Sequence, residues 1–240
     1  MKTLHFASID STNTYLLNHY KELEHFTFVS ADVQTAGKGR NQRVWKSENG
    51  SNLLFSLLIR DSSFFEYYRA ISMVCAYSVL SVLRDFGVTD AMIKWPNDVY
   101  VGGKKICGIL LQGVAVEEME CLVAGIGINV NQTFFDGDYL HQTTSVALQV
   151  GKVDLEVFKH AVYTQLEQDL NALVQGKRYL EVISEVDFLK GRSCFAEIDN
   201  EKKPVQVLGI NQDYELDVVV DNQIRSVGNG EITFHLDESF

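Results

Sequence analysis

A basic segment with two glycines spans residues 34–46 and contains the side chains best suited to bind an anion. It holds four cations and no acid, in a chain whose overall charge is negative. Gly37 and Gly39 allow consecutive backbone N–H groups to point toward one anion, and the cations add charge around it. The cations are Lys38, Arg40, Arg43 and Lys46. The segment predicts a phosphate or carboxylate site.

The alternative interpretation of this segment is a solvated basic loop, and the two interpretations are close to parity. The segment is not a P-loop, because the G-x-x-x-x-G-K-[ST] pattern is absent. It is not a dinucleotide fingerprint either, since Gln42 stands where the third glycine belongs. Polar stretches of this length inside compact domains are usually functional.

The second candidate is the segment Lys94-Trp95-Pro96-Asn97-Asp98, which follows a predicted strand. Lys94 could hold an anion, and the oxygens of Asn97 or Asp98 could bind Mg²⁺. The structural alternative is a proline turn in which Asp98 accepts hydrogen bonds from backbone N–H groups. Residue types alone favour this alternative modestly.

Three shorter segments also have both a functional and a structural interpretation. Lys105 follows a double-glycine turn and could reach a nucleotide, although charged hairpin tips are common. Asn129 follows a strand with two glycines, which mark either a ligand's close approach or packing between strands. Residues 10–13, Asp-Ser-Thr-Asn, begin a helix, and capping explains one of these side chains but not the whole polar row.

Predicted strands and helices must position these segments. A continuous apolar run predicts a buried strand at residues 53–59, and apolar residues at helical spacing predict a helix over 64–86. Further strands are predicted at 4–7, 26–33, 91–94, 99–101, 105–116 and 119–128, and further helices after residue 10, at 153–173 and at 179–186. Hairpin-linked strands mixed with helices indicate an α+β fold with a mixed β-sheet.

The pattern changes after Phe188. Five short β-type runs separated by polar turns follow, at residues 194–198, 205–210, 216–220, 224–227 and 232–236. Short, evenly spaced strands are typical of a small barrel or sandwich. We therefore predict two domains, 1–187 and 188–240.

Composition narrows the classes of function. The 240 residues include 21 Lys and Arg against 32 Asp and Glu, a net charge of −11, with 46% hydrophobic residues. These values exclude a disordered chain and argue against a general nucleic-acid binder, which needs positive charge to displace counterions. The four cysteines lack zinc-site or disulfide-framework spacing, and neither a signal peptide nor a membrane-spanning run is apparent. We expect a soluble, cytoplasmic protein with reduced thiols.

Taken together, the segments resemble those of the biotin protein ligases, also called biotin–[acetyl-CoA-carboxylase] ligases. The matching pieces follow the family's order and are Ser11-Thr12-Asn13, the 34–45 loop, Lys94-Trp95-Pro96-Asn97-Asp98, 105–111 and 125–129. The resemblance covers the whole chain. It implies a class II synthetase-like catalytic domain followed by a small C-terminal SH3-like β-barrel.

Three positions depart from the family's pattern. Lys38 replaces the first arginine of the loop, and Gln42 replaces its second glycine. Lys38 keeps the charge without the bidentate fork of arginine, which predicts weaker anion binding. Gln112 stands where a glutamate is frequent, and the sequence alone gives this change no interpretation.

The resemblance implies a two-step reaction. The biotin carboxylate attacks the α-phosphate of ATP, giving biotinyl-5′-AMP and pyrophosphate with Mg²⁺, and a lysine of a biotin carboxyl carrier protein then displaces AMP. The first step brings two anions together, so cations must screen their repulsion. Lys94, Arg40 and Lys105 are the implied catalytic residues, and Asp98 or Asn129 is expected to help place the metal.

The resemblance also implies contacts to biotin and to the nucleotide. Ser11, Thr12 and Gln34 match positions that hydrogen-bond the ureido ring, and Trp45 is expected to pack nearby. The implied binding set is Ser11, Thr12, Asn13, Gln34, Gly37, Lys38, Gly39, Arg40, Arg43, Trp45, Lys94, Asn97 and Asn129. The loop is expected to be mobile when empty and ordered by ligand, which keeps water from the anhydride.

Two alternatives stay open. A lipoate or octanoate ligase shares the implied fold and adenylate chemistry but needs a long apolar slot. A non-catalytic biotin-binding module is favoured only if the loop substitutions abolish activity. The implied partners are the carrier protein, biotin and ATP, with homodimer formation left open. Repressor members of the family carry an N-terminal helix-turn-helix domain, and this chain begins at the first catalytic strand, so no role with DNA or membranes is expected.

Overall fold

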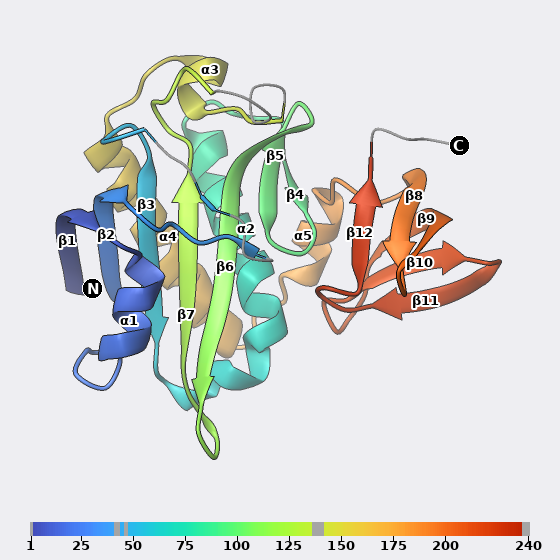
Figure 1. Cartoon of the computed structure of the whole chain (residues 1–240), viewed down its shortest axis with the longest axis horizontal. Coiled ribbons are helices and arrows are strands. Elements are labelled where there is room, and N and C mark those ends of the chain that lie inside the picture. Colours follow the sequence, from blue (N-terminus) through green and yellow to red (C-terminus); the bar gives the residue numbers. More distant parts are fainter. Residues whose placement is uncertain (1, 41–43, 46–47, 136–141, 237–240) are drawn as a thin grey trace.

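The computed structural model describes residues 2–40, 44–45, 48–135 and 142–236. Seven strands form one sheet in the order β1-β2-β3-β7-β6-β5-β4 (Figure 1). β1 and β2 pair in parallel and the other neighbours are antiparallel, so the sheet is mixed. The strands are β1 (Lys2–Ile9), β2 (Thr27–Gln34), β3 (Leu53–Ile59), β4 (Ala91–Lys94), β5 (Asp98–Val101), β6 (Lys104–Ala115) and β7 (Met119–Ile128).

Helices lie on both faces of this sheet. Behind it, as seen in Figure 1, α2 (Tyr68–Asp85) and α4 (Leu155–Val174) each bury an apolar side in the main core. In front of it, α1 (Thr12–His19) covers only the lower part of the strands, where Leu16 is fully buried in a second cluster with Leu58 and Val123. The upper part of the front face is left for a cavity.

A second, antiparallel sheet follows in the order β11-β10-β9-β8-β12. Its strands are β8 (Ser193–Ile198), β9 (Glu201–Ile210), β10 (Leu216–Val220), β11 (Gln223–Val227) and β12 (Ile232–His235). It lies beside the β4–β5 edge of the large sheet (Figure 1). Trp95 Nε1 donates to the carbonyl of Tyr214 at 2.9 Å, and Arg69 pairs with Glu215 at 2.7 Å. These contacts fasten the small sheet to the turn that follows Lys94 and to the start of α2.

The predicted fold class is confirmed, because a mixed sheet with helices is followed by a small antiparallel β domain. The strands at 53–59, 91–94, 119–128 and 216–220 have the predicted bounds. The predicted boundary between residues 187 and 188 falls between α5 (Leu180–Glu185) and β8. This division into domains stays a prediction.

Two elements differ from the sequence-based expectation. The predicted helix over 64–86 is a 3₁₀ turn at Ser62–Tyr67 followed by α2, since Asp61 accepts a hydrogen bond from Ser63 N and starts a separate tight turn. Helix α3 (Val146–Val150) was not predicted, because five residues are too few to display a helical period.

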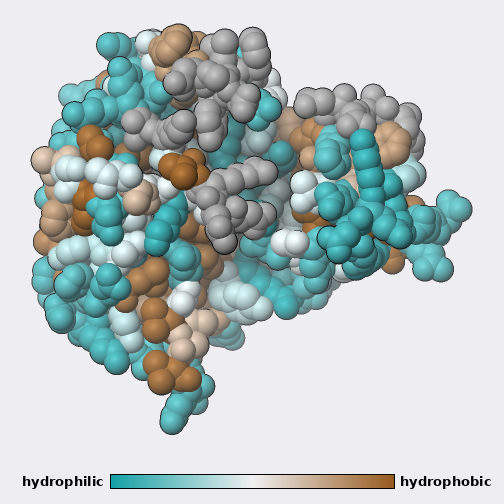
Figure 2. Space-filling view, in the orientation of Figure 1, coloured by the Kyte–Doolittle hydropathy of each residue, from teal (hydrophilic) through white to brown (hydrophobic). Residues whose placement is uncertain are grey.

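The surface on the front face is mostly hydrophilic (Figure 2). Apolar side chains gather toward the tip of the β6–β7 hairpin, where Val116 is 72% exposed. Isolated exposed apolar residues are normal on a folded protein. Among the described helices, none combines the length and the apolar character needed to cross a lipid bilayer.

Candidate active site

A cavity of about 700 Å³ lies on the upper front face of the large sheet. Its walls come from the start of α1, the 34–45 loop, the Lys94–Asp98 turn and β12, and its floor comes from β6 and β7. Because β12 belongs to the second sheet, both sheets contribute to the cavity. This volume is in the range of pockets that bind small organic ligands.

The floor of the cavity is formed by glycines. Gly108 and Gly127 are partners across the β6–β7 ladder, and the Trp45 ring lies on them. A Cβ added at Gly127 would come 2.6 Å from Trp45 Cε2, and one at Gly108 would come 2.9 Å from Cζ3 of the same ring. Such distances are well inside van der Waals contact, so only glycine admits the indole at these two positions. Among the described residues, the buried Trp45 Nε1 has no acceptor.

The loop above the floor folds back on itself. Lys38 and Val44 form an isolated antiparallel bridge, and Trp45 N donates to the carbonyl of Gly37 at 3.0 Å. A Cβ at Gly37 would lie 2.7 Å from the Trp45 carbonyl oxygen, which explains glycine there. The predicted contacts of Arg43 and the substitution at Gln42 lie outside the described residues.

Hydrogen bonds join the polar side chains at the α1 end of the cavity. Gln34 Oε1 accepts from Thr12 N at 2.8 Å, and Thr12 Oγ1 lies 2.7 Å from Ser56 Oγ. Ser56 Oγ donates to Asn13 Oδ1 at 2.5 Å, and Asn13 Nδ2 donates to Gln112 Oε1 at 2.9 Å. We call these five side chains the polar chain.

The centre of the polar chain is buried and fixed in place, whereas Gln34 and Gln112 at its ends are partly exposed. Ser11, Thr12 and Asn13 are at most 4% exposed and Ser56 is fully buried. Ser11 Oγ accepts from Thr14 N and caps α1, as the capping interpretation predicted for one residue of this row. A Cβ at Gly125 would lie 2.1 Å from Asn13 Oδ1, so this strand position requires glycine.

Besides Lys38, the cations Arg40, Lys94 and Lys105 line the cavity, and each of these three has a partner. Arg40 Nη1 donates to Asn97 Oδ1 at 3.0 Å, and Asn97 Nδ2 donates to the Ile109 carbonyl at 2.6 Å. Lys94 Nζ donates to the Tyr100 hydroxyl at 3.2 Å. These bonds hold positive charge at the cavity walls, where the low local dielectric strengthens its effect on an anion.

The third cation, Lys105, pairs with Asp98 across the β5–β6 hairpin. Lys105 Nζ lies 2.6 Å from Asp98 Oδ1 and 5.6 Å from the centre of the Trp45 ring. Both partners are shielded from water by more than half, so their attraction is stronger than at an exposed site. The pairing gives Asp98 a role that the sequence analysis did not anticipate.

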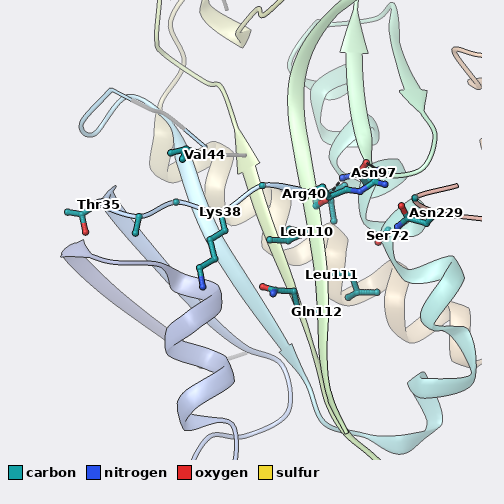
Figure 3. A pocket seen from close by; sticks show the side chains of 15 residues that line it. Thr35, Lys38, Arg40, Val44, Ser72, Asn97, Leu110, Leu111, Gln112 and Asn229 are labelled. Carbon is teal, nitrogen blue, oxygen red and sulfur yellow. Dashed lines mark hydrogen bonds between the residues drawn. The ribbon is translucent and has the colours of Figure 1, made fainter. Parts of the chain in front are cut away.

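A second cavity of about 820 Å³ lies on the other side of the loop. Figure 3 shows Arg40 beside Asn97, whereas Lys38 extends away from Arg40. Gln112 lines this second cavity and also joins the polar chain. The amide oxygen of Gln112 accepts a hydrogen bond as a glutamate at this position could, which interprets the departure that sequence alone left unexplained.

The first cavity collects nearly all the predicted site residues. Within the described part of the chain, every one of them lines it except Gly37, which lines the second cavity. Asn129 lines it too, but Asn129 Nδ2 donates to the carbonyl of Thr144 at 3.1 Å, which gives this residue a structural role. The binding and catalytic roles of the whole set stay predictions.

Sequence reasoning missed three contributors. Ser56 was hidden in an apolar strand, although it is the one polar residue of the run Leu53–Ile59 and this was the available signal. Tyr100 was not singled out, and no local pattern ties it to Lys94. The β12 wall comes from a distant part of the sequence, so its place at the cavity depends on the fold of both domains.

The cysteines do not supply a nucleophile. All four are buried and free. Burial raises the pKa of Cys75 to about 12 and raises that of Cys107, which lies beneath the cavity floor, still further. Both thiols are therefore protonated near neutral pH, and a thiol is far less nucleophilic than a thiolate.

Comparisons with known proteins agree with this geometry. The family described as "Biotin/lipoate A/B protein ligase family" matches residues 5–129. The bifunctional ligase/repressor BirA of Bacillus subtilis is 39% identical over 107 residues, covering 44% of this chain and 33% of that protein. The bifunctional ligase/repressor BirA of Escherichia coli is 31% identical over 168 residues, covering 70% of this chain and 51% of that protein. The matched stretch therefore spans a third to a half of these relatives.

Solved structures give the same result over a longer stretch. The biotin protein ligase from Aquifex aeolicus in complex with biotin and ATP superimposes with a TM-score of 0.84 at 25% identity. The superposition covers 98% of this chain and 99% of that one, so it includes the C-terminal sheet. A biotin protein ligase from Leishmania major in complex with biotinyl-5-AMP superimposes with a TM-score of 0.60 at 18% identity, a likeness of fold alone.

Proposed function

The chain belongs to the biotin/lipoate A/B protein ligase family, and from this premise we propose that it joins biotin to a carrier protein using ATP. One observation supports this most strongly: a single cavity combines the polar corner at Thr12 and Gln34 with the cations Arg40, Lys94 and Lys105 on its other walls. A cyclic urea suits the corner, whereas a carboxylate and phosphates suit the cations. The solved relative that superimposes over the whole chain holds biotin and ATP together.

The first step joins two anions. A carboxylate oxygen of biotin attacks the α-phosphorus of ATP, and the bond to the pyrophosphate oxygen breaks. Lys94 and Arg40 line the cavity where this repulsion must be screened, and fixed charges stabilise a transition state without reorganising. The bond from Arg40 to Asn97 supports a role in holding a phosphate, because an anchored guanidinium loses less entropy on binding.

The second step transfers the biotinyl group. The amine of a lysine on a carboxyl carrier domain attacks the carbonyl carbon of the anhydride, AMP leaves, and the nitrogen loses a proton as the amide forms. Trp45 and the loop that carries it lie over the glycine floor, and this cover supports the exclusion of water from the reactive anhydride.

We also propose that Mg²⁺ enters with the phosphates of ATP. The described part of the chain holds no cluster of three or more His, Cys, Asp or Glu side chains fit to bind a metal by themselves. Mg²⁺ is commonly held by one or two carboxylates together with substrate phosphates. Asp98 is the predicted contact, and its ion pair with Lys105 limits what it can contribute alone.

The family also contains lipoate ligases, which are the main alternative. Their substrates present a long apolar chain, which offers no hydrogen bond to the Thr12 and Gln34 oxygens on the cavity wall or to the buried Trp45 Nε1, which has no acceptor among the described residues. Buried polar groups left unpaired produce strong rejection of an analogue. The polar corner therefore favours biotin.

Partners and location complete the proposal. The net charge of −11 favours a small-molecule substrate and a protein carrier over DNA. Four free cysteines favour the reducing cytoplasm. A homodimer is also proposed, and light scattering of the purified chain would measure it.

ATP–pyrophosphate exchange with Mg²⁺ tests the proposed activity directly. Biotin, lipoate, octanoate and no acid are compared at equal concentration. Exchange with biotin alone is expected, and incorporation of label into a carrier domain then tests the transfer step. Exchange fastest with octanoate or lipoate would favour the alternative ligase. Binding of biotin without any exchange would favour a non-catalytic module.

A further inference from the structure

Ser56 occupies the centre of the polar chain. It is fully buried, lies on the interior strand β3 and pairs across the ladder with Gly125. Its hydroxyl lies 2.7 Å from Thr12 Oγ1 and 2.5 Å from Asn13 Oδ1. One side chain therefore connects the two α1 residues that carry the polar side of the cavity.

Backbone groups fix both ends of the polar chain. A backbone N–H can only donate, so the atom of Gln34 that faces Thr12 N at 2.8 Å is the amide oxygen. A carbonyl can only accept, so the atom of Asn13 that faces the Leu110 carbonyl at 3.3 Å is the amino nitrogen. Asn13 Oδ1 consequently faces Ser56 and requires a donor there.

Between these ends there are fewer hydroxyl protons than oxygen–oxygen contacts. Three oxygen–oxygen contacts join Gln34, Thr12, Ser56 and Asn13, with separations of 3.2, 2.7 and 2.5 Å in that order. Only two of these groups, the hydroxyls of Thr12 and Ser56, carry a proton. The two short contacts take them, because an oxygen pair that close without a proton is strongly repulsive.

Thr12 Oγ1 also lies within hydrogen-bond distance of Gln34 Oε1, at 3.2 Å, but a hydroxyl has a single proton. If that proton serves the shorter contact to Ser56, Thr12 Oγ1 and Gln34 Oε1 face each other with lone pairs only. Two lone-pair acceptors on the wall of one cavity are complementary to a donor from the ligand. An N–H group meets this need, and it can be shared between both oxygens. A carbonyl or a methylene cannot.

We propose that Ser56 is a positioning residue that gives the biotin site its selectivity for a ring N–H. The inference rests on the proposed function. It adds a residue that does not line the cavity but determines which lining oxygens remain free to accept a hydrogen bond from the ligand. By donating to Asn13, Ser56 draws the Thr12 proton away from Gln34 and keeps the acceptor pair open. Gln112 anchors the far end, since its oxygen and the Leu110 carbonyl hold the Asn13 amino group.

The central test is Ser56→Ala in the full chain. Without the serine oxygen, Gln34 Oε1 becomes the nearest acceptor for the Thr12 proton, which then occupies the place of the ligand's donor. Titration calorimetry measures the dissociation constants of biotin and of the analogue in which the ring N–H is replaced by CH₂. Biotin binding is expected to weaken about tenfold, which corresponds to a buried acceptor left unpaired. Binding of the analogue is expected to change less than about twofold, since this proton does not oppose it.

Ser78→Ala is the matched control. Ser78 is also a fully buried serine, and its hydroxyl shares its proton between the Val74 carbonyl and Asp169, away from the cavity. Its loss is expected to lower thermal stability while the ratio of the two dissociation constants stays as in the wild type. A merely structural role for Ser56 predicts that Ser56→Ala weakens both ligands equally, and that outcome overturns the inference.

A second pair of variants tests the anchor of the polar chain, Gln112. This test can be carried out even if Ser56→Ala does not fold. Gln112→Leu leaves only the longer contact to the Leu110 carbonyl to hold the Asn13 amino group. The group is then expected to turn toward Ser56 in part of the molecules, which reverses the polar chain and returns the Thr12 proton to Gln34. Gln112→Glu keeps an acceptor. The selectivity ratio is expected to fall in the leucine variant and to stay higher in the glutamate variant, and equal ratios would overturn the inference. Absence of biotin-dependent exchange in the wild type would instead refute the proposed function itself.

Discussion

Two buried polar clusters lie on opposite faces of the large sheet, and they are completed to different degrees. Behind the sheet, Asp169 is 3% exposed and accepts hydrogen bonds from Ser78 and Gln165 at 2.9 Å and from Tyr179 at 2.7 Å. In front of it, the polar chain has one proton fewer than its contacts need, and Trp45 Nε1 has no acceptor among the described residues.

The comparison separates two uses of buried polar groups. The Asp169 cluster joins α2, α4 and the start of α5, and its complete hydrogen bonding stabilises the fold. The polar chain is buried at its centre but incomplete, and a ligand can supply what is missing. Incompleteness of this kind, in a cavity beside cations, is what distinguishes the candidate site from the core.

Breaking the complete cluster should have the largest effect. Asp169→Ala leaves several buried donors without an acceptor and is expected to lower the free energy of unfolding by about 3–5 kcal/mol. Urea denaturation measures this. Exchange activity per folded molecule should stay within about threefold of the wild type, because the cluster does not touch the cavity. The exposed neighbour Gln168→Ala is the control, and a comparable loss there would contradict the assignment.

Removing a cation from the cavity beside the polar chain should have the opposite effect: activity falls while stability is kept. Lys94→Ala is expected to lower kcat/KM for exchange by about 10²–10³ while the free energy of unfolding changes by less than about 1 kcal/mol. Lys104→Ala, at the exposed first residue of β6, removes the same charge away from the cavity. If both variants lose activity equally, overall charge rather than the position of Lys94 is responsible.

A change in the cavity floor should have a smaller effect. Gly127→Ala places a methyl group 2.6 Å from the Trp45 ring and is expected to raise the dissociation constant of biotin about tenfold, because the loop must shift. Calorimetry measures the constant. Gly113→Ala meets the ends of the Met119 and Leu122 side chains, away from Trp45, and should leave the constant unchanged. Normal affinity in Gly127→Ala would mean that Trp45 does not define the ligand's place.

The smallest effect is expected at Asp187. Its hydrogen bonding is intermediate between those of the two clusters, because only one of its carboxylate oxygens has a partner in the described part of the chain. Its Oδ1 accepts from Leu189 N at 2.9 Å, and within the described residues its buried Oδ2 has no partner. Burial raises the pKa of Asp187, so its contribution to folding is greatest when it is protonated and is lost as the pH rises through that pKa. Asp187→Asn should therefore gain stability relative to the wild type as the pH rises from 4 to 7.

Urea midpoints at several pH values measure the Asp187 effect. A constant difference between variant and wild type would show that the carboxyl does not titrate differently in the folded state.

Much of the fold could be predicted because its signals are local. The continuous apolar run of β3 and the short runs after Phe188 each specify a strand by themselves. The cations of the site were also recognisable, since glycines and basic residues stand out in an acidic chain. Helix α3 was too short to display a period.

The connections within the site could not be predicted. Ser56 bonds to residues on α1, and Gln112 on β6 bonds to Asn13 almost a hundred positions away. Such pairs depend on strand order and register, which a single sequence does not reveal. For the same reason, Asp98 could be identified as a polar residue at a turn but not as the partner of Lys105.

The bare floor beneath Trp45 has a consequence for how the protein can evolve. At Gly108, Gly125 and Gly127 there is no side chain left to remove, so mutation can raise the floor but cannot deepen it. Acceptance of a bulkier substrate must therefore arise from changes in the overlying loop or in β12, because the backbone of the sheet fixes how deep the cavity can be.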